Sequence, residues 1–229
     1  MRLKIILSSE QPIQLPKYYQ HILQAVIYDL IKEDSIRDFL HNQGFRWEKR
    51  SFKPFTFSWL QGRYKVKQDQ IIFYPPVECQ ISSPWEPLIQ SILESFIAKR
   101  YLLLGRTKVV ISNLEMLPEP VLAEKTPIRT LSPITMYSTL FTPGGRKVTY
   151  YYHPKDPEFS VLIRRNLIKK AYAYYQQDLS KVPFSIQPME REGRIRQHTL
   201  RYKSLIIKGW MGDFFMEGDV RLQKLAFEM

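Results

Sequence analysis

The sequence has little cysteine and no long apolar run. Cys79 is the single cysteine among 229 residues, so an internal disulfide is excluded and a cytoplasmic location is the default expectation. No stretch approaches the ~20 apolar residues that a membrane-spanning helix needs. Segment 1–10 also lacks the apolar core and the cleavage site of a signal peptide. We therefore expect no membrane partner.

Several catalytic signatures are also missing. One cysteine cannot supply the Cys/His spacing of a zinc site, and neither a phosphate-binding glycine loop nor a GxSxG nucleophile motif occurs. The carboxylates are scattered, without the cluster typical of a magnesium-dependent nuclease. We therefore expect no cofactor. Phosphodiester chemistry in such a chain would use the 2′-hydroxyl of RNA as its nucleophile.

Basic and aromatic side chains are abundant. The 34 Lys and Arg residues outnumber the 22 Asp and Glu residues, and the net charge is +12. Cations that neutralise phosphates release counterions and drive binding to nucleic acid. The 14 Tyr and 13 Phe residues suit single-stranded partners, because bases stack on such rings. This balance favours a nucleic-acid partner over a protein that is basic without functional cause.

The basic residues form three clusters in the sequence. The middle cluster (Arg164, Arg165, Lys169 and Lys170) lies on a predicted helix and is equally well explained as its solvated face. The third cluster lies around a predicted pair of strands and is better placed to contact RNA. Our candidates for RNA binding are Arg46, Lys49, Arg50, Arg194, Arg196, Arg201, Lys203 and Lys208.

Hydrophobic periodicity predicts an α+β fold in the first half of the chain. A strand at 2–8 precedes a helix that Pro16 opens, and a short helix with Ser35 as N-cap ends before Gly44. The remaining predicted elements are a hairpin of 55–66 with 70–81, a helix that Pro84 opens, and a strand at 106–116. This order is that of a ferredoxin-like module.

The pattern restarts after a proline-rich segment, 117–133, which suggests a connection between two domains, 1–120 and 121–229. The second module is predicted to contain strands at 133–141 and 147–153, a helix from Asp156 to about Asp178, strands at 184–189 and 198–216, and a helix at 220–229 capped by Asp219. No last strand follows. We infer that the sequence ends early, and a natural five-element module is the alternative.

Three side chains could perform proton transfer on a phosphodiester. Tyr28 lies on the polar edge of its helix, His41 ends the short helix, and Lys53 precedes a strand. Histidine suits general acid or base work, and a lysine can lie beside a phosphate. Each also has an ordinary explanation, as a partly buried tyrosine, a capping histidine and a solvated lysine. His198, which lies among several arginines, is the strongest competing histidine.

Four segments together resemble the Cas-six endoribonucleases, which cut CRISPR repeat RNA. They are MRLKIIL, LPKYYQHILQAVIYDLI, FLHNQGF followed by FKPFTFSWLQG, and DPEFSVLIRRNLIKKAYAYY, and the likeness covers nearly the whole chain. The resemblance implies two tandem ferredoxin-like modules. It also implies a metal-independent cut that leaves a 2′,3′-cyclic phosphate and a 5′-hydroxyl. The family's tyrosine, histidine and lysine correspond to Tyr28, His41 and Lys53.

One departure from the family concerns the end of the chain. Members usually carry a glycine-rich loop and a last strand after the final helix, and this sequence has neither after 220–229. Since that loop contributes to RNA binding, we expect weaker affinity here. The alternative function is a non-catalytic RNA-binding subunit with the same fold. Repeat RNA is the expected partner, while a CRISPR effector complex and a second copy of the chain stay open.

Overall fold

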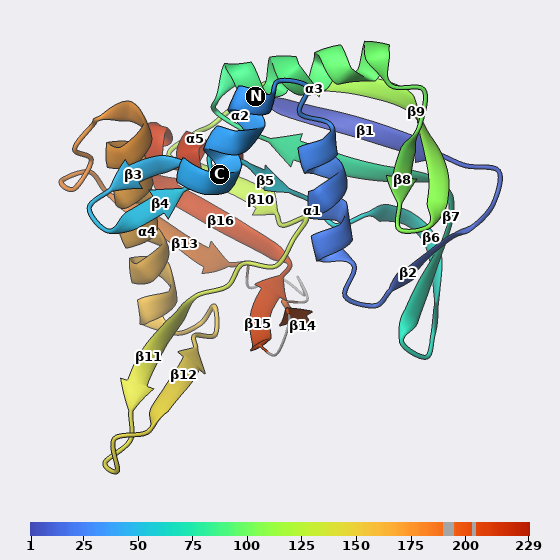
Figure 1. The fold of residues 1–229 in the computed structure, drawn as a ribbon. Coiled ribbons are helices and arrows are strands. Elements are labelled where there is room, and N and C mark those ends of the chain that lie inside the picture. Colours follow the sequence, from blue (N-terminus) through green and yellow to red (C-terminus); the bar gives the residue numbers. More distant parts are fainter. Residues whose placement is uncertain (190–194, 203–204) are drawn as a thin grey trace. The chain divides into compact units, whose positions relative to one another are not determined.

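The computed structural model describes residues 1–189, 195–202 and 205–229 (Figure 1). The chain divides into two compact units, which are described separately. Unit 1 comprises Met1–Pro120 with Glu228–Met229, and unit 2 comprises Val121–Phe227. No helix in these ranges is both long and apolar enough to span a bilayer.

Unit 1 is a sheet covered by helices on one face. Its elements are β1 (Arg2–Ser8), β2 (Ile13–Pro16), α1 (Gln20–Asp29), α2 (Asp34–Asp38), the π-helical turn η1 (Phe39–Gln43), β3 (Phe45–Trp47), β4 (Arg50–Phe52), β5 (Thr56–Phe57), β6 (Gln61–Lys67), β7 (Gln70–Ser82), α3 (Glu86–Ala98), β8 (Leu102–Leu104) and β9 (Thr107–Leu117). The sheet order is β2-β7-β1-β9-β8, with β5 and β6 also paired to β7.

The central strand β1 is antiparallel to both β7 and β9, as the ferredoxin-like order requires. Alternate residues of β1 (Leu3, Ile5 and Leu7) are buried in one core with apolar residues of α1 and α3. Apolar residues recur every two positions along the strand and every 3.6 positions along the helices, so each element has one apolar face, and these faces pack together in the core. This match of apolar faces is what the sequence pattern predicted.

Three features of unit 1 differ from the prediction. The N-cap residue of α2 is Glu33 and not Ser35, which lies inside the helix. Helix α1 begins at Gln20 and not at Pro16, because Pro16 ends β2 and pairs with Gln70. The short strands β2, β3, β4 and β8 were not predicted. Runs of three or four residues are too short to show a clear alternation, so their pairing depends on tertiary contacts.

Unit 2 contains a smaller antiparallel sheet and two separate hairpins. Its elements are β10 (Lys125–Arg129), β11 (Tyr137–Phe141), β12 (Lys147–Tyr151), α4 (Pro157–Tyr175), β13 (Phe184–Pro188), β14 (Arg196–Tyr202), β15 (Leu205–Met211), β16 (Asp213–Gly218) and α5 (Val220–Glu228). The sheet order is β10-β16-β13, while β11 pairs with β12 and β14 with β15. This is the order of the first three strands of a ferredoxin-like unit, and among the described residues no strand follows α5, as the sequence predicted.

The first strand of unit 2 is β10, so the prediction that 133–141 fills this position is wrong. Strand β10 lies inside the proline-rich segment that the sequence suggested was a connection. Pro127 pairs with Phe215 on an edge strand, where a missing N–H group is tolerated. The predicted long strand at 198–216 is a hairpin, β14 with β15, followed by β16.

The start of α5 is fixed by two polar side chains. Asp219 accepts a hydrogen bond from the Arg221 backbone N–H at 2.9 Å, so the predicted N-cap is confirmed. Gln223 is fully buried, and its Nε2 donates to the carbonyl oxygens of Ala123 (2.7 Å) and Gly218 (2.9 Å). One glutamine thus joins the helix to the segment before β10 and to the end of β16.

We predict that Gln223→Ala lowers the free energy of unfolding by about 1–3 kcal/mol, because the hydrogen bonds of this buried side chain to two backbone carbonyl groups are lost. Urea denaturation followed by circular dichroism measures this change. The control is Gln187→Ala, which truncates an exposed glutamine on β13. Equal stability of the two variants would contradict the role assigned to Gln223.

Candidate active site

Tyr28, His41 and Lys53 lie together on unit 1. The Lys53 Nζ is 3.4 Å from the Tyr28 hydroxyl oxygen and 3.2 Å from the His41 carbonyl oxygen, to both of which it donates. The Tyr28 and His41 rings are nearly perpendicular, with centroids 6.2 Å apart. The fold therefore brings the three residues selected from the sequence into one group, and their catalytic role stays a prediction.

Helix α1 holds Tyr28 with its ring packed and its hydroxyl directed outward. The preceding residues Val26 and Ile27 are buried, whereas Tyr28 is half-buried. Its ring packs edge-on against Phe55 at a centroid distance of 6.0 Å. The Lys53 Nζ also lies 5.9 Å from the centre of this ring. The phenol is thus fixed by packing and can present its hydroxyl group to a ligand.

The π-helical turn η1 exposes His41. Its neighbour Leu40 is completely buried and anchors the turn, so His41 faces outward. The Gly44 N–H donates to the Phe39 carbonyl at 2.8 Å, which closes the wide turn. Turns of this kind occur often at functional sites.

Gly44 allows strand β4 to approach η1 closely. Its φ angle is +68°, and a Cβ atom at this position would lie 2.7 Å from both the Phe52 carbonyl oxygen and the Ser51 Oγ. The Ser51 hydroxyl donates to the Gln43 carbonyl across the same contact. Only glycine fits here without strain. Because Lys53 directly follows β4, this approach is what brings its side chain to His41.

The His41 imidazole has a defined orientation. Its Nδ1 atom lies 2.7 Å from the side-chain oxygen of Asn42. An amide oxygen only accepts, so this contact assigns the proton of the neutral ring to Nδ1. The Nε2 atom then carries a lone pair and can accept a proton from a substrate. After it has accepted one, the same atom can donate it.

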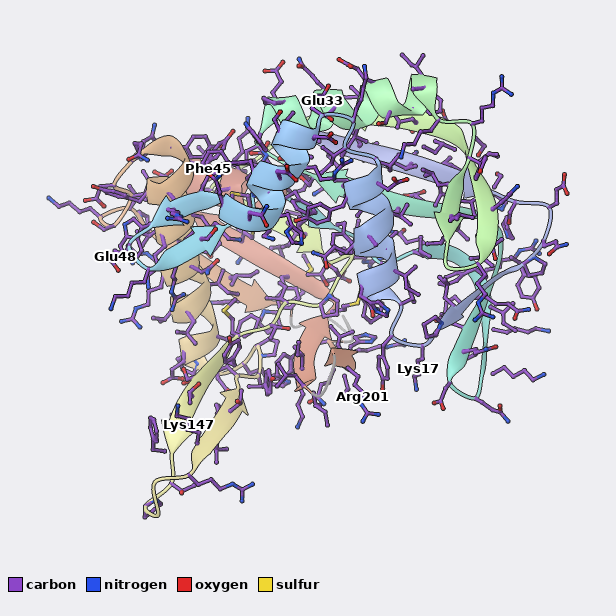
Figure 2. All side chains as sticks on the ribbon, viewed as in Figure 1. Lys17, Glu33, Phe45, Glu48, Lys147 and Arg201 are labelled. Atoms are coloured by element: carbon purple, nitrogen blue, oxygen red, sulfur yellow. The ribbon has the colours of Figure 1, made fainter. Side chains whose placement is uncertain are left out.

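The β3–β4 hairpin carries the first cluster of predicted RNA-binding residues. Arg46 and Arg50 are exposed on its strands, and Lys49 is exposed in the turn. Figure 2 labels Glu48, the residue before Lys49 in the same turn. Arg50 pairs with Trp47, so these two side chains lie on the same face of the hairpin. Arg46 is next to Trp47 in the strand and therefore points to the opposite face. The hairpin therefore presents cations on both faces.

The second predicted cluster lies partly on the β14–β15 hairpin of unit 2. Arg196 pairs with Met211, Arg201 pairs with Ile206, and Lys208 pairs with Thr199. Arg201 and Lys208 therefore share one face, and Arg196 lies on the other. Arg194 and Lys203 fall outside the residues that the structure describes.

His198, the competing histidine, lies on the Arg196 face of this hairpin. Burial and the nearby Arg196 guanidinium lower its pKa, which favours the neutral ring. In unit 1 a tyrosine ring and a lysine ammonium group lie beside His41. The arrangement around His41 is therefore better suited to acid–base chemistry.

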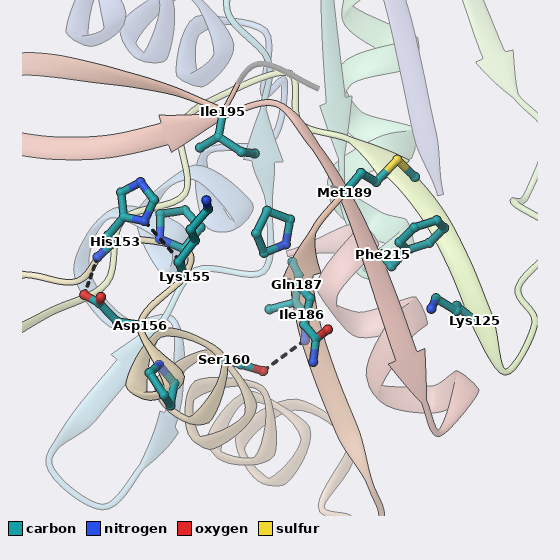
Figure 3. Close-up of a pocket in the computed structure, with 13 residues that line it drawn as sticks. Lys125, His153, Lys155, Asp156, Ser160, Ile186, Gln187, Met189, Ile195 and Phe215 are labelled. Carbon is teal, nitrogen blue, oxygen red and sulfur yellow. Dashed lines mark hydrogen bonds between the residues drawn. The ribbon is translucent and has the colours of Figure 1, made fainter. Parts of the chain in front are cut away.

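Unit 2 also contains a cleft of about 1450 Å³ beside the start of α4 (Figure 3). Its polar groups bond to one another: the His153 N–H donates to Asp156, and the Lys155 N–H donates to His153 Nδ1. Lys125 and Phe215 line the other side. Sequence reasoning missed this cleft, because strands and a helix far apart in the chain form it.

Metal-binding clusters and a reactive thiol are not found in the described ranges. No three His, Cys, Asp or Glu side chains there gather so that they could hold a metal ion. Cys79 is buried, and burial raises the pKa of its thiol to about 12. The cysteine is therefore a neutral core residue at physiological pH.

The comparisons with known proteins agree on one family. Residues 117–229 match the model described as CRISPR associated protein Cas6, C-terminal. A curated relative, CRISPR-associated endoribonuclease Cas6 2 of Methanocaldococcus jannaschii, is 27% identical over 199 residues, which cover 85% of this chain and 76% of the relative.

Solved structures extend the likeness to the whole chain. One CRISPR associated protein Cas6 is 25% identical, with a TM-score of 0.77 over 100% of this chain and 92% of the other. An RAMP protein binding different RNA substrates is 22% identical, with a TM-score of 0.79 and the same coverage. Together with the strand orders, these likenesses confirm the predicted tandem ferredoxin-like fold.

We predict that Gly44→Ala lowers the free energy of unfolding by about 1–3 kcal/mol, because alanine is strained at this positive φ angle and collides with β4. The control is Gly144→Ala, since nothing lies within 4 Å of a Cβ atom built at Gly144. Urea denaturation compares the two. A Gly44 variant as stable as the control would show that the close approach is not required.

Proposed function

The chain belongs to the Cas6 family, and on that premise we propose that it is an endoribonuclease that cuts CRISPR repeat RNA. The grouping of Tyr28, His41 and Lys53 is the observation that carries the proposal: the Lys53 ammonium donates to the Tyr28 hydroxyl and the His41 backbone carbonyl, and the Tyr28 and His41 rings are 6.2 Å apart. We further propose that the cut proceeds by internal attack and needs no metal ion.

The proposed reaction is a transesterification within the RNA. The oxygen of a 2′-hydroxyl attacks the adjacent phosphorus, and the bond from phosphorus to the 5′-oxygen breaks. One proton leaves the 2′-hydroxyl and one proton reaches the departing 5′-oxygen. The products are a 2′,3′-cyclic phosphate and a 5′-hydroxyl, so no water is consumed in this step.

His41 supplies one of the two proton transfers. With Nδ1 bonded to Asn42, Nε2 is free either to accept the 2′-proton or, when protonated, to donate to the 5′-oxygen. One imidazole cannot do both at the same moment. The Tyr28 hydroxyl is the partner for the other transfer, or it orients the scissile phosphate.

Lys53 stabilises the charge that develops on the phosphoryl oxygens. Its ammonium group already lies between the Tyr28 hydroxyl and the His41 carbonyl, so little reorganisation is needed when charge builds up. The same ammonium donates to the phenol oxygen. Hence Lys53 also orients Tyr28 for its contact with the phosphate.

RNA outside the scissile bond contacts the basic hairpins in this proposal. In unit 1 these residues are Arg46, Lys49 and Arg50, on the hairpin that leads from η1 to Lys53. In unit 2 they are Arg196, Arg201 and Lys208, with Arg194 and Lys203 proposed from the sequence alone. Contacts from such side chains to phosphates position the strand without reading its sequence.

We predict that His41→Ala slows cleavage of repeat RNA by about 10²–10⁴-fold. Single-turnover assays in EDTA measure the rate, and analysis of the product ends detects the cyclic phosphate. His21→Ala is the control, because His21 is an exposed histidine of α1 whose Nδ1 contacts the Tyr18 backbone carbonyl.

Three results would count against the proposal. If the His41→Ala variant cuts at the wild-type rate, His41 has no catalytic role. A wild-type protein that loses activity in EDTA and regains it with a divalent metal contradicts the metal-independent mechanism. Repeat RNA that is bound but stays intact supports the alternative, a non-catalytic RNA-binding subunit.

We predict that Tyr28→Phe lowers the single-turnover rate by at least about 10²-fold if the hydroxyl transfers a proton. Phenylalanine keeps the ring packing against Phe55, so the melting temperature should not change. Tyr18→Phe is the control on a nearby half-buried tyrosine. A smaller rate loss with a higher KM would instead assign Tyr28 to positioning of the phosphate.

A further inference from the structure

The outer part of the β6–β7 hairpin carries a row of cations that the proposed active site does not use. Strand β6 lies at the edge of the sheet and pairs only with β7, whose other side pairs with β2 (Figure 1). Arg63, Lys65 and Lys67 occupy alternate positions of β6 and are all exposed. Side chains at alternate positions of a strand point to the same face.

The register of the hairpin shows which face this is. Tyr64 pairs with Phe73, which is buried in the core, and the two rings are 5.7 Å apart. Tyr64 and Val66 therefore lie on the core side of the sheet. Arg63 and Lys65 pair with Tyr74 and Ile72, so the cations lie on the opposite face, away from the core.

These cations have no acidic partner among the residues that the structure describes. None of the three forms an ion pair within 4.0 Å there. The hairpin carries two acidic residues, Asp69 in its turn and Glu78, which pairs with Gln61 at the inner end of β6. The outer part of this face, from Arg63 to Lys67, is therefore a strip of positive charge without an ion-paired carboxylate.

The spacing of the strip fits a particular kind of ligand. Successive cations are about 7 Å apart along the strand, since each residue of a strand advances the chain by about 3.3 Å. This is close to the separation of successive phosphates in an extended single strand. Tyr74, half-buried beside Arg63, adds an aromatic ring on the same face, on which a base can stack.

We propose that Arg63, Lys65 and Lys67 bind successive phosphates of a single-stranded RNA segment, with Tyr74 stacking on one of its bases. This inference rests on the proposed function, because it assigns part of the RNA substrate to a surface outside the active site. The strip binds without regard to base sequence, since ammonium and guanidinium groups contact only the phosphates.

A simpler role for charged residues on an edge strand is to prevent pairing with another chain. That role predicts aggregation when the charges are removed, but no change in RNA binding. RNA binding predicts a change in its salt dependence, because each phosphate contact with a single strand contributes about 0.7 to the slope of log affinity against log salt. The two roles are therefore separable by measurement.

The experiment compares wild type with the triple variant Arg63→Gln/Lys65→Gln/Lys67→Gln. The control, Arg100→Gln/Arg106→Gln/Lys108→Gln, removes the same charge from exposed positions around β8. Affinity for a fluorescent oligouridylate is measured over a range of salt concentrations. Thermal melting and light scattering test whether each variant is folded and monodisperse, and cleavage of repeat RNA is measured in parallel.

We expect the slope to fall by about 2 in the triple variant and to stay near the wild-type value in the control. Restoring charge with Arg63→Lys/Lys65→Arg/Lys67→Arg should restore the slope. An unchanged slope in the triple variant overturns the inference, whether or not the variant aggregates, and so does wild-type protein that does not bind the oligouridylate.

The same experiment distinguishes a failure of the proposed function from a failure of this inference. Suppose that wild type does not cut repeat RNA, but that the salt slope of binding falls by about 2 in the triple variant. The cationic strip then binds RNA, and the proposed activity is wrong. If wild type cuts repeat RNA and the slope is unchanged, the activity stands and the strip has no part in it.

Discussion

The candidate site depends on the close contact of two backbones at Gly44. Strand β4 passes so near the end of η1 that a Cβ atom at this position would meet the Phe52 carbonyl oxygen at 2.7 Å. The chain leaves β4 directly at Lys53, and its ammonium group therefore reaches the His41 carbonyl. A wider separation of turn and strand would leave the histidine and the lysine as two unrelated surface residues.

Each residue of the site is adjacent in sequence to a buried one. Ile27 precedes Tyr28, Leu40 precedes His41, and Pro54 follows Lys53. The buried neighbours belong to the packing that the apolar pattern dictates, so they fix the backbone on which each polar group stands. Functional side chains held in this way keep their geometry while they remain accessible to a large ligand such as RNA.

The two units share the order of three strands, β1-β7-β6 in unit 1 and β10-β16-β13 in unit 2, but differ in what they add to it. Unit 1 extends its sheet with β2, β8 and β9, and the outer half of β6 presents cations on the face away from the core. Unit 2 keeps a three-stranded sheet and adds the separate hairpins β11–β12 and β14–β15. A polyanionic substrate thus has several basic strands to contact, which agrees with the net charge of +12.

The sequence by itself determined the fold class, the long helices and the identity of the three clustered side chains. The spacing of apolar residues along β1, α1 and α3 is a local property that can be read from the sequence. Tyr28, His41 and Lys53 were selected because they match the positions of the family's tyrosine, histidine and lysine. Only the tertiary structure showed that Pro127 lies in a strand. Proline has no N–H group to donate, which is tolerated because β10 is an edge strand. The tertiary structure also decided which face each cation occupies and how near Lys53 lies to His41. Those properties depend on strand register and on backbone contacts between segments far apart in the chain, which no local pattern records.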